Sequence, residues 1–198
     1  MKKWILSAVL FVSACAGLQT SSEYLLRGDG YFKDGKPQLA IKSYNKAISL
    51  NPSNAEGYAS RGTVYFFQGD YDKAREDFVK VLGINPYQVE AYTAYASAAA
   101  AQGEYEHALN ILNYALRLDP TKPEIFFSRA GIYFMLGKYE EAARDYSSVI
   151  ALRPAKEVFE ARAAVYLKMG KDELAEKDFE TVRTASMPDT LHTYSMIK

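Results

Sequence analysis

Residues 58–82 read YASRGTVYFFQGDYDKAREDFVKVL and contain two helical patterns separated by a glycine turn. In the first half, two tyrosines stand seven residues apart with small residues between them, which is the spacing of one helical face. In the second half, Ala74, Phe78 and Leu82 recur every four residues and share a face as well. Gly69 permits the tight turn between the halves, because glycine adopts backbone conformations that other residues rarely adopt. The stretch therefore predicts a hairpin of two helices.

This hairpin recurs five times along the chain. Its turn glycines, 34, 34, 34 and 33 residues apart, are Gly35, Gly69, Gly103, Gly137 and Gly170. The alanines that follow them by five residues are Ala40, Ala74, Ala108, Ala142 and Ala175. The first four units end at prolines, which disfavour a helical residue before them: Pro52, Pro86, Pro120 and Pro154. Because one helix pair is too thin to bury its own apolar face, neighbouring units are expected to stack into a continuous core.

The spacing and the residues that hold it resemble the tetratricopeptide repeat (TPR), from about residue 21 to 187. The resemblance implies an all-α, right-handed TPR helical solenoid of five helix-turn-helix repeats, with ten helices, no strands and a concave face that binds protein or peptide partners. The expected repeats span residues 21–54, 55–88, 89–122, 123–155 and 156–187. The remaining residues, 188–198, are either a short cap or an unstructured end.

Charged residues recur within the repeats in a paired pattern. Each pair is separated by sixteen residues: Arg61 with Asp77, Arg129 with Asp145, and Arg162 with Asp178. The third unit has Tyr95 and Ile111 at these two places, so that both charges disappear together. The first unit keeps Arg27 but has Ser43. We predict structural ion pairs that join the two helices of a unit, because an unpaired charge at such a place is costly.

The concave face is the expected recognition surface, and in the TPR family the first helix of each unit forms most of it. The candidate side chains by repeat position are Thr63, Phe66, Phe67, Thr93, Ser97, Ala100, Phe127, Phe134 and Met135. They suggest a floor of small residues between aromatic walls, suited to an apolar peptide or helix. The alternative is that Phe66 and Phe134 only pack between units, while the alanines only allow closer stacking.

The N-terminal residues have the three parts of an export signal. Two lysines precede an apolar run from Trp4 to Phe11, and small residues follow it. The run has about half of the roughly 20 apolar residues that a membrane-spanning helix needs. Val12-Ser13-Ala14-Cys15 resembles the bacterial lipobox, which implies a lipoprotein signal peptide at 1–14 and a lipidated N-terminus and tether at 15–22. Ordinary cleavage after Ala16 would discard the cysteine instead.

The sequence gives little sign of enzymatic chemistry. Lys plus Arg and Asp plus Glu are 24 each, and a zero net charge argues against nucleic-acid binding. Phosphate-loop, serine-hydrolase and HExxH metal motifs are absent. Cys15, His107 and His192 cannot assemble a structural zinc site, and His107 is expected on a solvated helix surface. We therefore expect no catalytic residue, no metal and no cofactor.

Together these features predict a lipid-anchored TPR scaffold or adaptor in the cell envelope. Its partners would be envelope proteins or peptides, and a lipid on Cys15 would hold it at the membrane. Ala16, rather than an aspartate, follows the cysteine, which favours the outer membrane, facing the periplasm, in a bacterium with two membranes. A self-associating structural envelope protein and a secreted, non-lipidated TPR adaptor are the alternatives.

Overall fold

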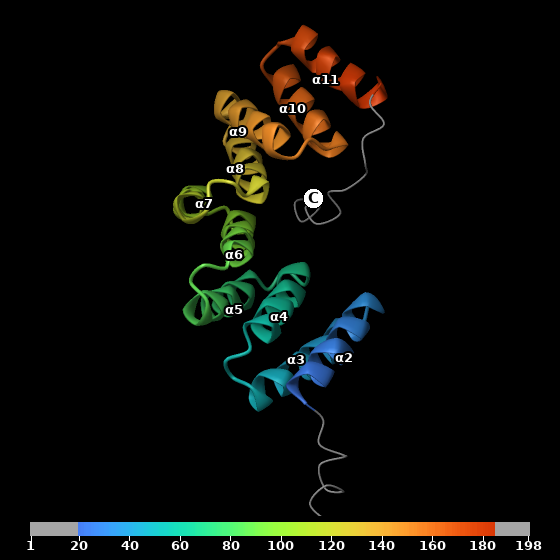
Figure 1. Cartoon of the computed structure of the whole chain (residues 1–198), viewed down its shortest axis with the longest axis vertical. Coiled ribbons are helices and arrows are strands. Elements are labelled where there is room, and N and C mark those ends of the chain that lie inside the picture. The colour runs from blue at the N-terminus through green and yellow to red at the C-terminus, as the bar shows by residue number, and fades with distance from the viewer. Residues whose placement is uncertain (1–19, 185–198) are drawn as a thin grey trace, which may run out of the picture.

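The computed structural model describes residues 20–184 as ten helices and no strands. Their bounds are α2 (Ser21–Lys33), α3 (Pro37–Leu50), α4 (Ala55–Phe67), α5 (Tyr71–Ile84), α6 (Val89–Ala101), α7 (Tyr105–Leu118), α8 (Pro123–Met135), α9 (Tyr139–Leu152), α10 (Lys156–Lys168) and α11 (Asp172–Thr184). The all-α solenoid predicted from the sequence is confirmed (Figure 1). Cys15, the signal segment, His192 and the tail at 188–198 lie outside the described residues.

Each turn inside a unit is made by its glycine. The five turn glycines have φ between +67° and +82°, the left-handed region in which a Cβ is strained. The residue after each glycine donates its backbone N–H back to the last turn of the preceding helix, as Asp70 does to the Tyr65 carbonyl at 2.9 Å. This is the Schellman pattern that satisfies free carbonyls at a helix end. The second helix can therefore start at once and fold back on the first.

The ends of the helices also follow the sequence signals. Pro37 and Pro123 stand in the first turns of α3 and α8, where no backbone N–H is needed. The second helices of the first three units end at Leu50, Ile84 and Leu118, two residues before a proline. At the N-terminus, Thr20 caps α2: its hydroxyl accepts from the Glu23 N–H, and the Glu23 carboxylate accepts from the Thr20 N–H, both at 3.2 Å.

Small residues allow the paired helices to approach closely. The five alanines that follow the turn glycines are all buried, with at most 1% of their surface exposed. Larger buried side chains of the second helices, such as Tyr44, Phe78 and Leu112, fill the space next to them. Gly28 shows how close the contact is, since a Cβ there would lie 2.4 Å from Cε1 of Tyr44. Packing at this density fixes the register of one helix against the other.

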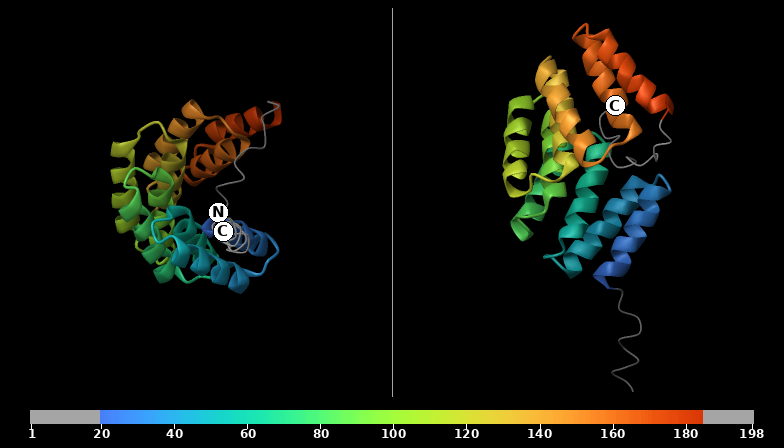
Figure 2. Two further views of the ribbon diagram at one scale, coloured as in Figure 1. Left: turned by 60° about the horizontal axis from the view of Figure 1, so that its bottom comes forward. Right: turned by 45° about the horizontal axis from the view of Figure 1, so that its top comes forward.

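The units stack into an arch. The first helices contact one another along the chain, α2 with α4, α4 with α6 and α6 with α8. Within residues 20–184, consecutive second helices make no comparable contact. Since the inside of a bend has the shorter path, the first helices line the inner face and the second helices the outer one. Figure 1 shows α7 on the outside of the bend, and Figure 2 shows the arch turned toward the viewer.

Candidate protein-binding surface

The predicted arginine–aspartate pairs lie side by side in the structure. Nε and Nη2 of each arginine donate to the two carboxylate oxygens of its aspartate over 2.6–2.9 Å, which is a bidentate pair between the two helices of one unit. The aspartates are almost fully buried. In the second unit, the hydrogen bond to Asp77 raises the pKa of Arg61 further above its usual range. These side chains are occupied with one another, as a structural role requires.

Each of these arginines also reaches the unit before it. In each case the donor is Nη1. Arg61 donates to Oδ1 of Asn45 at 2.5 Å, and Arg129 donates to Oδ1 of Asn113 at 2.7 Å. Arg162 donates to Oγ of Ser147 at 2.8 Å. One guanidinium therefore joins three helices. These partners were not predicted, although they lie sixteen, sixteen and fifteen residues before the arginines, at positions that the repeat register defines.

The second unit divides its predicted surface residues between the core and the inner face. Phe66 is only 8% exposed and packs on Tyr71 at a ring-centroid distance of 5.4 Å, so the prediction that it lines the groove is wrong. Phe67, the next residue, is 56% exposed. It contacts the ring of Phe32 in α2 at 5.7 Å. The Thr63 hydroxyl donates to the Ala59 carbonyl of its own helix.

In the third unit the predicted surface residues are small and half-buried. The Thr93 hydroxyl donates to the Glu90 carbonyl, and the Ser97 hydroxyl donates to the Thr93 carbonyl, both at 2.9 Å. Both donors are therefore used within α6. Ala100 is half-buried against the core of its unit, whereas Ala101 is exposed. Ala101, rather than Ala100, therefore presents the small residue to solvent.

In the fourth unit, two of the three candidates contact rings of their own unit. Phe127 lies 5.5 Å from the Tyr146 ring, and Phe134 lies 5.6 Å from the Tyr139 ring, both half-buried. Met135 is 59% exposed. Phe134 is therefore partly a packing residue, and the ring it contacts belongs to its own unit rather than to a neighbouring one.

At one repeat position, exposed side chains recur from unit to unit. At this position all five first helices carry an exposed residue, and we call the set the inner stripe: Lys33, Phe67, Ala101, Met135 and Lys168. Its centre is apolar and each end carries a lysine. Only Phe67 and Met135 were predicted; the other three positions follow from Phe67 by steps of 34 or 33 residues.

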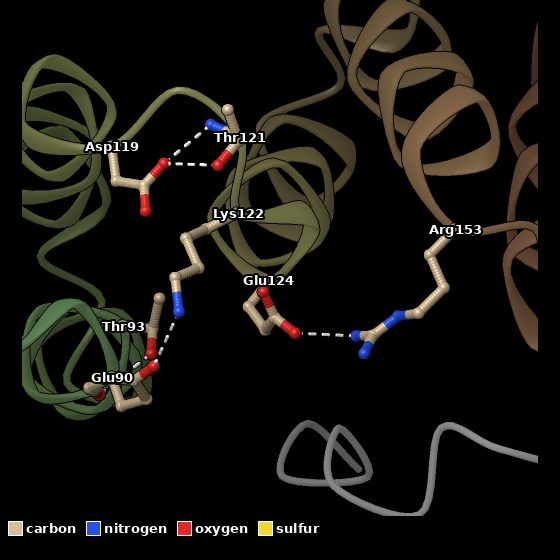
Figure 3. Close-up of polar contacts among 7 residues, drawn as sticks. All are labelled: Glu90, Thr93, Asp119, Thr121, Lys122, Glu124 and Arg153. Carbon is tan, nitrogen blue, oxygen red and sulfur yellow. Dashed lines mark hydrogen bonds and ion pairs between the residues drawn. The ribbon is translucent and has the colours of Figure 1, made fainter.

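A row of glutamates runs along the first turns of the first helices, and two of them are neutralised in the structure. Lys122 Nζ lies 3.3 Å from Glu90 Oε1, and Arg153 Nη2 lies 2.6 Å from Glu124 Oε1 (Figure 3).

The turn between α7 and α8 is held by Asp119, whose Oδ1 accepts from the Thr121 hydroxyl at 2.6 Å and the Thr121 N–H at 2.9 Å. These two hydrogen bonds lower the pKa of the Asp119 carboxyl.

The titratable side chains of the described residues are spread along the repeats. His, Cys, Asp and Glu side chains do not gather in threes, as a metal site needs, anywhere in the described part of the chain. His107 is exposed, and its Nε2 lies 3.3 Å from the Tyr95 hydroxyl. Between residues 20 and 184, no helix is both long and apolar enough to cross a bilayer.

Comparisons with known proteins agree with the repeat pattern. A tetratricopeptide repeat family model matches residues 65–126 and 99–165, and a second TPR repeat model matches residues 28–69. A tetratricopeptide repeat protein from Parabacteroides merdae ATCC 43184 is 27% identical, with a TM-score of 0.70 over 90% of this chain and 70% of that one. No curated protein matches the chain.

Two further solved structures share the fold at lower identity. TTC0263, a thermophilic TPR protein of Thermus thermophilus, is 22% identical, with a TM-score of 0.70 over 82% of this chain and 90% of that one. YrrB, described as a TPR protein with an unusual peptide-binding site, is 20% identical, with a TM-score of 0.59 over 81% of this chain and 83% of that one.

Proposed function

This chain belongs to the tetratricopeptide repeat family, and from that premise we propose that it is a lipid-anchored, non-enzymatic scaffold that binds an envelope protein along the inner stripe. TPR proteins bind protein or peptide partners, and the fold here is theirs. The observation that carries the proposal is the exposure of Phe67 and Met135, 56% and 59%, on the face lined by the first helices. A contiguous exposed apolar patch on a protein surface often marks a partner site, and Ala101 joins Phe67 and Met135 into one apolar row.

The chemistry of the inner stripe suggests the kind of segment it takes. Its apolar part runs from Phe67 across Ala101 to Met135, while Lys33 and Lys168 stand at its ends. An apolar stretch flanked by acidic residues complements this pattern, because burial supplies affinity and opposite charge sets the orientation. A small residue at the centre leaves room for a bulky side chain of the partner.

Photocrosslinking in the native envelope tests the surface. The photoreactive residue p-benzoylphenylalanine is placed at Phe67 or Met135, and at Val79 on α5 as the control, since Val79 is 49% exposed but lies on a second helix. The same partner should attach at the first two sites and not at the third. Equal labelling at all three sites, or attachment at Val79 alone, would refute recognition by the inner face.

The anchor is tested separately from the surface. Cys15 follows a lipobox-like stretch, and two or more acyl chains hold a protein on a bilayer. Cys15→Ala is expected to abolish radiolabelled palmitate incorporation and to move the protein from the membrane fraction to the soluble one. If wild-type protein takes up no label and its mature N-terminus lies beyond Cys15, the secreted, non-lipidated form is the correct one.

The self-associating alternative would bring end repeats of two copies together, and the charges on the last unit count against stacking there. In unit three, Leu109 and Leu116 of α7 pack with Ile125 and Ile132 of the next unit, whereas in unit two the first of these positions is Arg75, paired with Glu104 of the third unit. At the same repeat positions α11 carries Glu176 and Arg183, joined by an ion pair at 2.5 Å. Stacking another unit on this face would bury those charges. Sizing at several concentrations should show a monomer.

A further inference from the structure

The first unit has the aromatic frame of the arginine–aspartate pairs without the aspartate. In the fourth unit, the guanidinium carbon of Arg129 lies 5.8 Å from the Phe126 ring and 5.7 Å from the Tyr133 ring, and Asp145 completes the site. The second and fifth units have the same arrangement around Arg61 and Arg162. Rings on both sides orient a guanidinium toward one direction, which is where the carboxylate binds.

In the first unit this direction is open. Arg27 lies over the Tyr24 ring at 5.1 Å, and Tyr31 stands at the second ring position. Ser43 takes the place of the aspartate, and its hydroxyl donates to the Leu39 carbonyl of its own helix at 3.0 Å. Arg27 makes no ion pair with any residue between 20 and 184. The unit therefore keeps the cation and its frame but supplies no acid.

The open space is a cavity of about 600 Å³ between α2 and α3. Its lining includes Arg27, Lys42 and Lys46 and contains no carboxylate. Neither lysine forms an ion pair within the described residues. The corresponding cavity of the third unit, about 270 Å³, has Tyr95 and Ile111 in place of the charged pair and is lined mainly by aromatic rings. The excess of positive charge is thus a property of the first unit and not of this repeat position in general.

We propose that this cavity binds a carboxylate side chain of an acidic segment on a protein partner. Three other units of the same chain show what the frame holds: an Asp carboxylate borne on protein, bidentate on the arginine between two rings. Lys42 and Lys46 add charge for further acidic residues of the segment. The cavity lies between the two helices of a unit, away from the inner stripe, so it does not depend on the function proposed above.

One substitution fills the site with the acid found in the other units. Ser43→Asp places a carboxylate sixteen residues after Arg27, where the aspartates of the complete pairs are themselves buried. With the full chain purified in a mild detergent, a fluorescent hexaglutamate peptide is titrated by anisotropy at low ionic strength. Ser43→Asp should weaken peptide binding by about tenfold or more while leaving the melting temperature equal or higher. Arg27→Gln, at an exposed position, should weaken it comparably.

Matched lysines control for general electrostatic attraction. Lys80 has in the second unit the repeat position that Lys46 has in the first, but there the arginine is already paired. Lys46→Ala should weaken binding of the peptide, and Lys80→Ala should not. Equal effects of the two, or unchanged binding by folded Ser43→Asp and Arg27→Gln, would overturn the proposal. Arg27-dependent binding of phosphatidylglycerol vesicles or inorganic phosphate without binding of the peptide would overturn it in favour of a phosphate ligand.

Discussion

Exchanging the charged pair of the fourth unit for its third-unit counterpart tests how the ion pairs support the fold. Asp145 is 5% exposed and accepts both hydrogen bonds from Arg129, whose side chain is 18% exposed. Asp145→Ile removes the acid and leaves the guanidinium with Asn113 and two rings. The second change, Arg129→Tyr, removes the stranded charge and recreates the Tyr and Ile combination that the third unit uses.

The expected magnitudes follow from the burial of the two groups. Removing one partner of a fully buried pair costs about 3–5 kcal/mol, and the partial exposure of Arg129 reduces this to about 2–3 kcal/mol. For a chain of this size, that loss lowers the melting temperature by roughly 4–12 °C. The double variant should return to within about 1 kcal/mol of wild type, because replacing a buried ion pair with apolar residues is often neutral.

Urea unfolding followed by circular dichroism, on wild type, both single variants and the double variant, gives the coupling free energy of a double-mutant cycle. A coupling of at least about 1.5 kcal/mol is expected, with the singles clearly less stable than the double. If Asp145→Ile alone is within about 0.5 kcal/mol of wild type, or if the two single losses simply add, the pair is not the structural element that its geometry indicates.

Three further outcomes are expected. In the same urea assay, Gly28→Ala should lower the free energy of unfolding by about 2–3 kcal/mol, because the added Cβ would lie 2.4 Å from the Tyr44 ring. Gly30→Ala is the control: its Cβ would have nothing within 4 Å, so this variant should be about 0.5–1 kcal/mol more stable than wild type. Burial, with a smaller contribution from the neighbouring Asp145 carboxylate, raises the pKa of Tyr146 to about 12. The contribution of Tyr146 to the free energy of unfolding should therefore be complete below pH 10 and decrease as the pH rises toward 12. Tyr146→Phe should reduce this loss of stability at high pH, and an unchanged loss would contradict the burial argument. Ala101→Glu should reduce partner capture in a pull-down while the circular dichroism spectrum stays unchanged. Ala151→Glu, at an exposed position on α9, is the control and should leave capture intact. Equal capture by both variants would argue against recognition by the inner stripe.

Most of the fold can be predicted from the repeat register of the sequence. Turn glycines, the alanines after them and the prolines between units are local signals, and each acts within a few residues of where it stands. Their fixed spacing over five copies predicts the ten helices and predicts that Arg61 lies opposite Asp77, as the structure shows. The same register contained the inner stripe and the partners of the arginines in the preceding units, which were found only in the structure.

What the sequence could not decide is which of two neighbouring side chains reaches the surface. Phe66 and Phe67 are alike in chemistry and stand one residue apart, yet the first is 8% exposed and the second 56%. Consecutive residues of a helix point about 100° apart, so their burial depends on where the next unit crosses the helix. That crossing is set by packing between units, which joins Phe67 to Phe32 and leaves the Arg27 cavity open at the start of the arch. Local spacing determined the helices and their pairing, whereas the contacts between units determined which side chains a partner can reach.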